Sequence, residues 1–150
     1  MGITIKKILA ERGYISIPLE LTLTQHLVLE AKINGATGRF ILDTGASSTC
    51  VGIEWINYFQ LSAKNSDIKA SGAGSSNMET QISTQNYLQI EELTLLKVPL
   101  VLFDLSHINS ALSQFQTLPI HGIIGADILK KRKAVIDYTS KRLYLYKGKH

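Results

Sequence analysis

The segment Phe40–Ser48 (Phe-Ile-Leu-Asp-Thr-Gly-Ala-Ser-Ser) carries the residues of this 150-residue chain that are best suited to chemistry. Apolar residues lead into Asp43, and an aspartate at the end of an apolar strand is costly unless its carboxylate is hydrogen-bonded or has a task. Gly45 permits a close approach of the backbone, so its amide can be directed at that carboxylate, and Thr44 can lock the turn through its hydroxyl. On its own, an Asp-Thr-Gly tripeptide also fits a purely structural turn.

A second segment, about eighty residues downstream, changes this interpretation. Ile120–Leu129 (Ile-His-Gly-Ile-Ile-Gly-Ala-Asp-Ile-Leu) places an apolar pair, a glycine and the start of a helix in succession. Between the two segments, Ala70–Asn77 is rich in glycine and serine and indicates a hairpin tip or a mobile loop between two strand-like flanks. This order of motifs resembles the retropepsin-like aspartic proteases, which include viral enzymes and single-domain cellular relatives. The resemblance extends over about residues 27–146.

The resemblance implies a role for each matching residue. Asp43 would be the catalytic aspartate, Thr44 would hold two active-site loops together across a dimer, and Gly45 would contact the substrate backbone. The loop around residues 71–75 would be the flap over the substrate, and Ile124 and Gly125 would pack beneath the active-site loop. The implied substrate-binding residues, of which the last lines a side-chain pocket, are Ala46, Ser47, Ser71, Gly72, Ala73, Gly74 and Ile123.

Hydrolysis of a peptide bond without a metal requires a base and an acid side by side. Two carboxylates about 3 Å apart supply both, because they cannot both ionise and therefore share a proton. The chain contains one Asp-Thr-Gly, so the active species would be a symmetric homodimer with one Asp43 from each subunit. We therefore expect an aspartic endopeptidase that acts on peptide or protein substrates with no metal or other cofactor.

Two positions depart from relatives of this family. Ser47 stands where many viral enzymes carry an acidic residue that grips the substrate backbone, so their substrate preference does not transfer. Ala46 lacks the hydroxyl that two-domain, pepsin-like enzymes place beside the aspartate. Because one hydrogen bond to the ionised carboxylate is then missing, we expect a less acidic optimum, at about pH 4–6.5.

The elements that position these residues follow from the apolar pattern. Alternation with a period of two predicts strands, which we expect at Ile15–Leu23, His26–Ile33, Arg39–Leu42, Tyr87–Ile90, Leu93–Phe103, Ala134–Tyr138 and Arg142–Tyr146. Asn34-Gly35 predicts a tight hairpin turn. Short helical segments are expected within Ile53–Leu61, Asp104–Phe115 and Ala126–Lys131. Many short strands with very little helix indicate a closed barrel or a sandwich. The resemblance implies the closed barrel, as one all-β domain over residues 1–150 with one short helix near the C-terminus.

Composition excludes several classes of protein. Hydrophobic residues at 45% and charged residues at 19% exclude general disorder. Cys50, the single cysteine, excludes an internal disulfide and a zinc site of several thiolates, and the histidines show no metal-ligand spacing. We find no signal peptide and no apolar run near the roughly 18 residues of a membrane helix. We therefore expect a cytoplasmic protein without a membrane partner.

Two other functions remain open on the sequence alone. One is a module that keeps the fold for peptide binding or dimerisation but does not cleave. The other is a nucleic-acid binder, because eight of the sixteen basic residues follow position 129. We favour the view that Lys130–Lys133 simply close a helix and stay solvated, and we expect no nucleic-acid partner.

The remaining candidate groups are assigned structural roles. Asp127 is expected to interact with backbone at a helix start, and Asp104 and Asp137 to lie at strand ends or turns. Cys50 is expected to be a buried small apolar residue rather than a nucleophile. His121 is interpreted as a loop residue.

Overall fold

The computed structural model describes residues 4–70 and 78–148. The strands are β1 (Tyr14–Pro18), β2 (Glu20–Leu21), β3 (Leu27–Ile33), β4 (Ala36–Leu42), β5 (Cys50–Gly52), β6 (Lys64–Ala70), β7 (Met78–Ile90), β8 (Leu93–Phe103), β9 (Gly122–Ile124), β10 (Val135–Asp137) and β11 (Arg142–Tyr146). The helices are α1 (Ile5–Glu11), α2 (Ser106–Gln114) and α3 (Ala126–Lys131), with a 3₁₀ turn, η1, at Ile53–Trp55.

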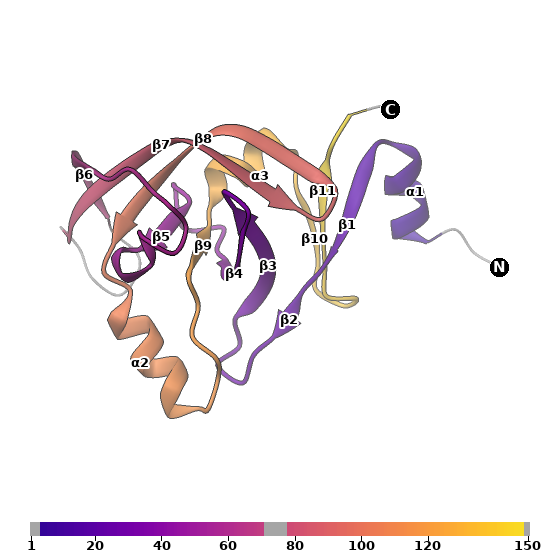
Figure 1. Ribbon diagram of the computed structural model, residues 1–150. Coiled ribbons are helices and arrows are strands. Elements are labelled where there is room, and N and C mark those ends of the chain that lie inside the picture. The colour runs from indigo at the N-terminus through magenta and orange to yellow at the C-terminus, as the bar shows by residue number, and fades with distance from the viewer. Residues whose placement is uncertain (1–3, 71–77, 149–150) are drawn as a thin grey trace.

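Six of the strands form a closed barrel in the order β3-β4-β9-β5-β8-β7 (Figure 1). The ring closes because β3 also pairs with β7, at Lys32 opposite Gln89 and Ile33 opposite Leu88. Strands β2 and β6 continue the sheet beyond this ring. The predicted all-β closed barrel is therefore confirmed, and closure removes the free edges that an open sheet would expose.

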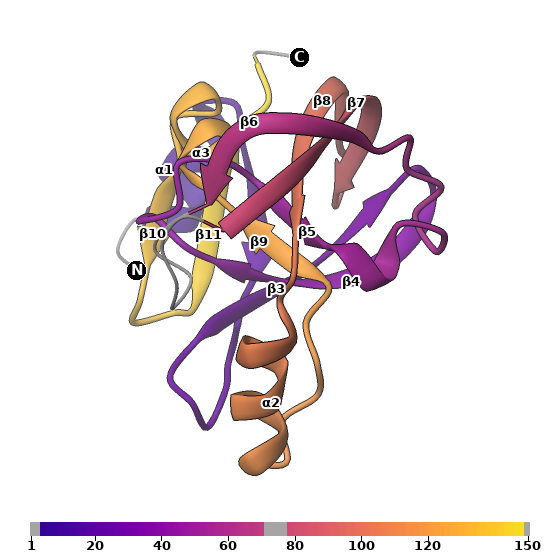
Figure 2. The same cartoon turned by 90° about the vertical axis from the view of Figure 1, so that its left-hand side faces the viewer.

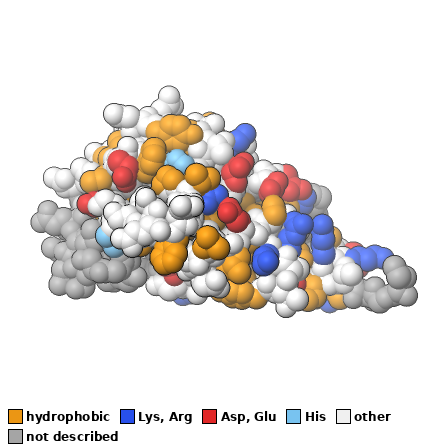
Figure 3. Space-filling model, turned by 90° about the horizontal axis from the view of Figure 1, so that it is seen from below, with side chains coloured by type: hydrophobic (Ala, Val, Ile, Leu, Met, Phe, Trp, Pro, Cys, Tyr) orange, Lys and Arg blue, Asp and Glu red, His pale blue; other side chains and the backbone are white. Residues whose placement is uncertain are grey.

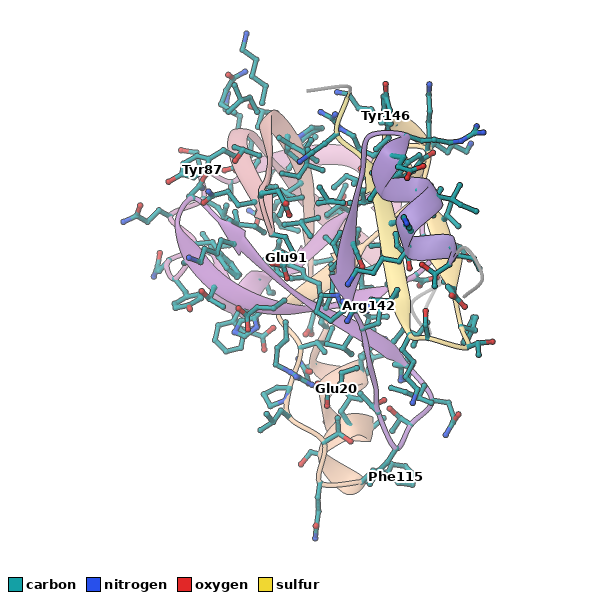
Figure 4. The ribbon with its side chains drawn as sticks, turned by 90° about the vertical axis from the view of Figure 1, so that its right-hand side faces the viewer. Glu20, Tyr87, Glu91, Phe115, Arg142 and Tyr146 are labelled. Carbon is teal, nitrogen blue, oxygen red and sulfur yellow. The ribbon has the colours of Figure 1, made fainter. Side chains whose placement is uncertain are left out.

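The strands nearest the N- and C-termini form a separate sheet in the order β1-β11-β10. Strand β11, which runs between the labelled Arg142 and Tyr146 in Figure 4, pairs with β1 on one edge and with β10 on the other. Both edges of β11 are therefore occupied within one chain. In the part of the chain that the structure describes, the unpaired edges of this sheet belong to β1 and β10.

The hairpin between β3 and β4 positions the Asp-Thr-Gly segment. Its turn residues Asn34 and Gly35 have φ values of 51° and 88°, the two positive values that a type I′ turn requires. The predicted tight turn is thus confirmed. Strand β4 then runs back along β3 and ends at Leu42, one residue before Asp43.

Side chains of the barrel strands divide between two apolar clusters. The inner cluster fills the barrel and includes Leu42 and Ile124, whereas their neighbours Ile41 and Ile123 belong to a second cluster. We call the second one the outer cluster; its buried members are Val28, Ile41, Cys50, Val101, Phe103, Leu105, Leu112, Ile120 and Ile123. The division follows from the alternation of side chains along a strand.

Several predicted elements differ from the structure. The single strand expected over Ile15–Leu23 is split, because β1 pairs with β11 and β2 pairs with β3. Its alternation consequently fails after Leu19, and Leu23 is 75% exposed. The segment Ile53–Leu61 contains only the 3₁₀ turn and irregular turns.

Helix α3 lies where the short helix near the C-terminus was predicted, and α2 lies within the helical segment expected over Asp104–Phe115. Helix α1 was not predicted. Helix α2 has nine residues and projects from the barrel (Figure 2). In the parts of the chain that the structure describes, no helix is long and apolar enough to cross a membrane.

Candidate active site

Residues 43–49 form the loop that joins β4 to β5, and we call it the 43–49 loop. The backbone N–H of Asp43 donates to the carbonyl of Ile124 at 3.0 Å, which extends the parallel pairing of β4 with β9 into the loop. The Gly45 N–H donates to Asp43 Oδ1 at 2.9 Å, as the sequence predicted, and the Ala46 N–H donates to the Asp43 carbonyl at 3.2 Å. The carboxylate is therefore held in a tight turn at the end of an apolar strand.

The loop is open to solvent around the carboxylate. Asp43 is half-buried, whereas Thr44, Gly45 and Ser47 are exposed and Ala46 is half-buried. In the described part of the chain, the Gly45 amide is the one hydrogen-bond donor to the Asp43 carboxylate. The carboxylate thus keeps free acceptor capacity in a position that a water molecule or a substrate can reach.

Gly125 lies directly against this loop, as the resemblance implied. A Cβ atom at position 125 would lie 2.7 Å from the carbonyl oxygen of Ser48 and 2.8 Å from that of Ala46, so no larger residue fits. The next amide, that of Ala126, donates to the Ala46 carbonyl at 2.7 Å. The backbone at the start of α3 therefore fixes the position of the 43–49 loop.

A second carboxylate, that of Asp127, anchors the far end of the loop. Asp127 Oδ2 accepts from the Thr49 N–H at 3.0 Å, and Oδ1 accepts from the Thr49 hydroxyl at 2.8 Å and from the Ile128 N–H at 2.9 Å. The Thr49 hydroxyl in turn accepts from the Gly125 N–H at 3.1 Å. The backbone role expected for Asp127 is confirmed.

Thr49 is a site residue that sequence reasoning missed. It is fully buried (0% exposed) although its side chain is polar, which is tolerated because its hydroxyl both donates and accepts a hydrogen bond. Its position six residues after Asp43 and its partner 78 residues away gave no local signal.

The structure describes only some of the other predicted site residues. Ile123 is 3% exposed and belongs to the outer cluster, so its side chain does not line an open pocket in this chain. The predicted flap residues 71–74 lie outside the described residues. Strands β6 and β7, which flank that segment, form the predicted hairpin arms.

Two further groups are excluded from nucleophilic roles. Burial, together with the negative charges of Asp127 and Asp43, raises the pKa of the Cys50 thiol to about 12, and its Sγ donates to the Ser48 carbonyl at 3.1 Å. The His121 ring packs on Trp55 with centroids 4.4 Å apart, and burial lowers its pKa. Its Nδ1 accepts from the Arg39 N–H at 3.0 Å. Cys50 is thus an inert buried thiol, as expected, and His121 is a packed ring.

The described residues contain no group of three or more histidine, cysteine, aspartate or glutamate side chains that could hold a metal ion. The groups that the 43–49 loop presents are the Asp43 carboxylate and the backbone amides beside it. Proton transfer by such a carboxylate is a general acid–base mechanism.

Comparison with known proteins agrees with the geometry. A family model described as aspartyl protease matches residues 29–128, two thirds of the chain. A comparison with curated proteins found no match.

Three solved structures share the fold. A retropepsin-like aspartic protease from Rickettsia conorii has 18% identity and a TM-score of 0.56, covering 89% of this chain and 91% of its own. The EIAV protease in complex with the inhibitor HBY-793 has 19% identity and a TM-score of 0.56, covering 77% and 95%. The retroviral protease-like domain of Ddi1 from Leishmania major has 14% identity and a TM-score of 0.55, covering 84% and 90%. The chain therefore belongs to the aspartyl protease family and has the retropepsin-like fold.

Proposed function

We propose that this protein is an aspartic endopeptidase that hydrolyses peptide bonds as a homodimer. The observation that carries the proposal is the state of Asp43: its carboxylate lies on a solvent-reachable turn, and one backbone amide is its donor in the described part of the chain. Asp127, at the other end of the same loop, by contrast has its carboxylate occupied by three donors.

The homodimer follows from the number of carboxyl groups that the reaction needs. One chain supplies one Asp-Thr-Gly turn, and the mechanism needs a base and an acid in contact. Exposed Thr44 and Gly45 at the tip of the 43–49 loop leave room for the same loop of a second copy. In an isologous dimer, the two loops meet at the two-fold axis, which brings the two carboxylates together.

The reaction then proceeds by proton transfer between the two Asp43 side chains, the water and the substrate. The ionised Asp43 takes a proton from the water as its oxygen attacks the peptide carbonyl, and the protonated Asp43 donates its proton to the carbonyl oxygen. Collapse of the tetrahedral intermediate breaks the C–N bond, and the amine leaves with a proton returned by the carboxyl pair. The apparent pKa values of this pair belong to the dyad and not to one residue.

Thr44, Gly45, Ala46 and Ser47 complete the proposed site. Thr44 would join the two loops across the dimer, and the exposed backbone of Gly45 to Ser47 would bind the substrate main chain. Because Ala46 offers no hydroxyl to stabilise the ionised carboxylate, we expect the rate to peak at about pH 4–6.5. A rate profile that peaks near pH 2 would contradict this expectation.

Digestion of a diverse peptide library, read by mass spectrometry between pH 3 and 7, tests the proposal. The wild type and Asp43→Asn are compared at high protein concentration, with the dimer measured in the same buffer. Cleavage by the wild type alone supports the endopeptidase. If neither protein cleaves although the dimer is present, the proposal fails in favour of a non-catalytic peptide-binding or dimerisation module.

A further inference from the structure

A groove of about 220 Å³ lies between β8 and α3, which both lie in the upper part of the molecule in Figure 1. Three of its lining residues also belong to the inner cluster: Leu95, Val98 and Ile128 are 5%, 7% and 5% exposed. The lining also includes Leu96, which is 72% exposed, and the exposed Pro99. The groove therefore offers apolar surface to a ligand.

A bulge in β8 shapes one side of this groove. Leu96 and Lys97 stand opposite the single residue Tyr87 of β7, and Lys97 has a φ of 55°. A bulge interrupts the alternation of side chains between the two faces of a sheet. Leu96 and Lys97 are consequently both exposed although they are consecutive, and both line the groove.

Three cations line the same groove. Lys97 belongs to the bulge, whereas Lys131 ends α3 and Arg132 follows it. Within the described residues, none of the three forms a salt bridge. Arg132 is half-buried, and its Nε is buried without a hydrogen-bond acceptor in the described part of the chain. A buried donor without an acceptor is costly, and an anion in the groove would supply an acceptor.

The remaining polar lining residue is Asp127. Its oxygens are already occupied by the donors of Thr49 and Ile128. Three cations and one carboxylate give the lining a net charge of +2. Among the described residues that line the groove, no side chain is both neutral and polar, so the side chains offer little to a peptide backbone. The volume is also below the roughly 300–1,000 Å³ of pockets for drug-sized ligands.

We propose that the groove between β8 and α3 binds a medium-chain fatty carboxylate. The tail packs on Leu96, Val98 and Ile128, where it removes apolar surface from water. The carboxylate pairs with Lys131 and Arg132, whose charges no described residue neutralises. This site does not depend on the proposed endopeptidase activity, and binding is measured without any cleavage assay.

Calorimetric titration of octanoate into the full chain tests the proposal. Octanoate has a tail and a charge, so 1-octanol and acetate serve as matched ligands that each lack one of the two. We expect a Kd of about 1 mM or tighter for octanoate, which corresponds to an ordinary affinity per heavy atom. Both matched ligands should bind about tenfold more weakly or worse, because each loses one set of contacts.

Variants place the binding in the groove. Leu96→Ser removes tail contacts, and Lys131→Gln and Arg132→Gln remove head-group charges; each should weaken octanoate binding about fivefold or more. Leu96 and Lys131 are exposed, so their variants should fold as the wild type does. The matched controls, Leu118→Ser and Lys130→Gln, change exposed residues outside the groove and should stay within about twofold of the wild type.

The charge control is needed because cations also gather elsewhere on the surface. Viewed from below, Lys and Arg side chains lie mainly on the right, toward α1 (Figure 3). If Lys130→Gln weakens binding as much as Lys131→Gln, or if octanol binds as well as octanoate, the proposed site is wrong. Absence of octanoate binding to the folded wild type, well above the expected Kd, would also overturn the proposal. Binding of a leucine-terminated peptide in place of octanoate would overturn it in favour of a peptide site.

Discussion

The two carboxylates at the ends of the 43–49 loop have opposite surroundings. Asp127 accepts three hydrogen bonds, from the amide and hydroxyl of the buried Thr49 and from the Ile128 amide. Within the described residues, Asp43 accepts one, from Gly45, and lies on an exposed turn. A carboxylate saturated with donors stabilises structure, because each charge-assisted bond favours its fixed position. A carboxylate with spare acceptor capacity is available for proton transfer.

The comparison also shows how the two roles depend on each other. Asp127 holds Thr49, and Thr49 accepts from the Gly125 amide, which lies under the Asp43 turn. Asp127 therefore fixes the position of the turn that carries Asp43. An error of about 1 Å at the reacting groups can cost roughly a hundredfold in rate.

Exchanging Asp43 for asparagine should have the largest effect on catalysis and nearly none on folding. We expect kcat/KM to fall by about 10⁴-fold or more, because a base of the dyad is lost. The asparagine Oδ1 can still accept from Gly45, so the free energy of unfolding should change by less than about 0.5 kcal/mol. Peptide cleavage and denaturant unfolding measure the two quantities.

Removing the Asp127 carboxylate should lower the stability of the fold. Asp127→Ala leaves the buried Thr49 amide and hydroxyl without their acceptor, so we expect the free energy of unfolding to fall by about 2–4 kcal/mol. Thr49→Ser, which retains the hydroxyl, is the mild control, and Thr49→Val should lose much of the same stability. An Asp127→Ala protein as stable as the wild type would show that Asp127 does not brace the loop.

The pKa of the Cys50 thiol is raised, mainly by burial and further by the negative charges of Asp127 and Asp43. Between about pH 9 and about pH 12, an unfolded chain has released this proton while the folded chain retains it. The folded state then binds more protons, so stability should fall as the pH rises through this window. Unfolding of Cys50→Ala should show a shallower loss, and equal slopes would contradict the assignment.

Alkylation tests the same thiol more directly. At pH 8 the native protein should react with iodoacetamide far more slowly than the unfolded chain, because the thiolate is the reactive form. Rapid labelling of the native protein would show that Cys50 is reachable and ionised. The rate can be followed by the mass of the intact protein.

Local patterns predicted the parts of the site that depend on neighbours in the chain. Alternation predicted β3 and β4, and Asn34-Gly35 predicted the turn between them. Asp43 was therefore expected directly after an apolar strand. The bond from the Gly45 amide to the Asp43 carboxylate is also local, spanning two residues. These features follow from backbone geometry and side-chain periodicity alone.

Features that depend on distant contacts were not predictable in the same way. Thr49 and Asp127 are 78 residues apart, and Ile123 shares a buried cluster with Leu112 of α2, a contact that no local pattern predicts. Leu23 fitted an alternating strand, yet the chain changes sheets near Leu19 and leaves it exposed. In each case, tertiary packing overrides the local pattern.

Mixing wild type with Asp43→Asn tests the shared-dyad claim most directly. Total protein is held constant at a concentration where the dimer is confirmed, subunits are allowed to exchange, and peptide cleavage is measured against the wild-type fraction. If one Asp43 from each subunit is needed, activity should fall as the square of that fraction, so an equal mixture keeps about a quarter of the activity. A linear fall, with half the activity left in the equal mixture, would show that each chain acts alone and would contradict the account.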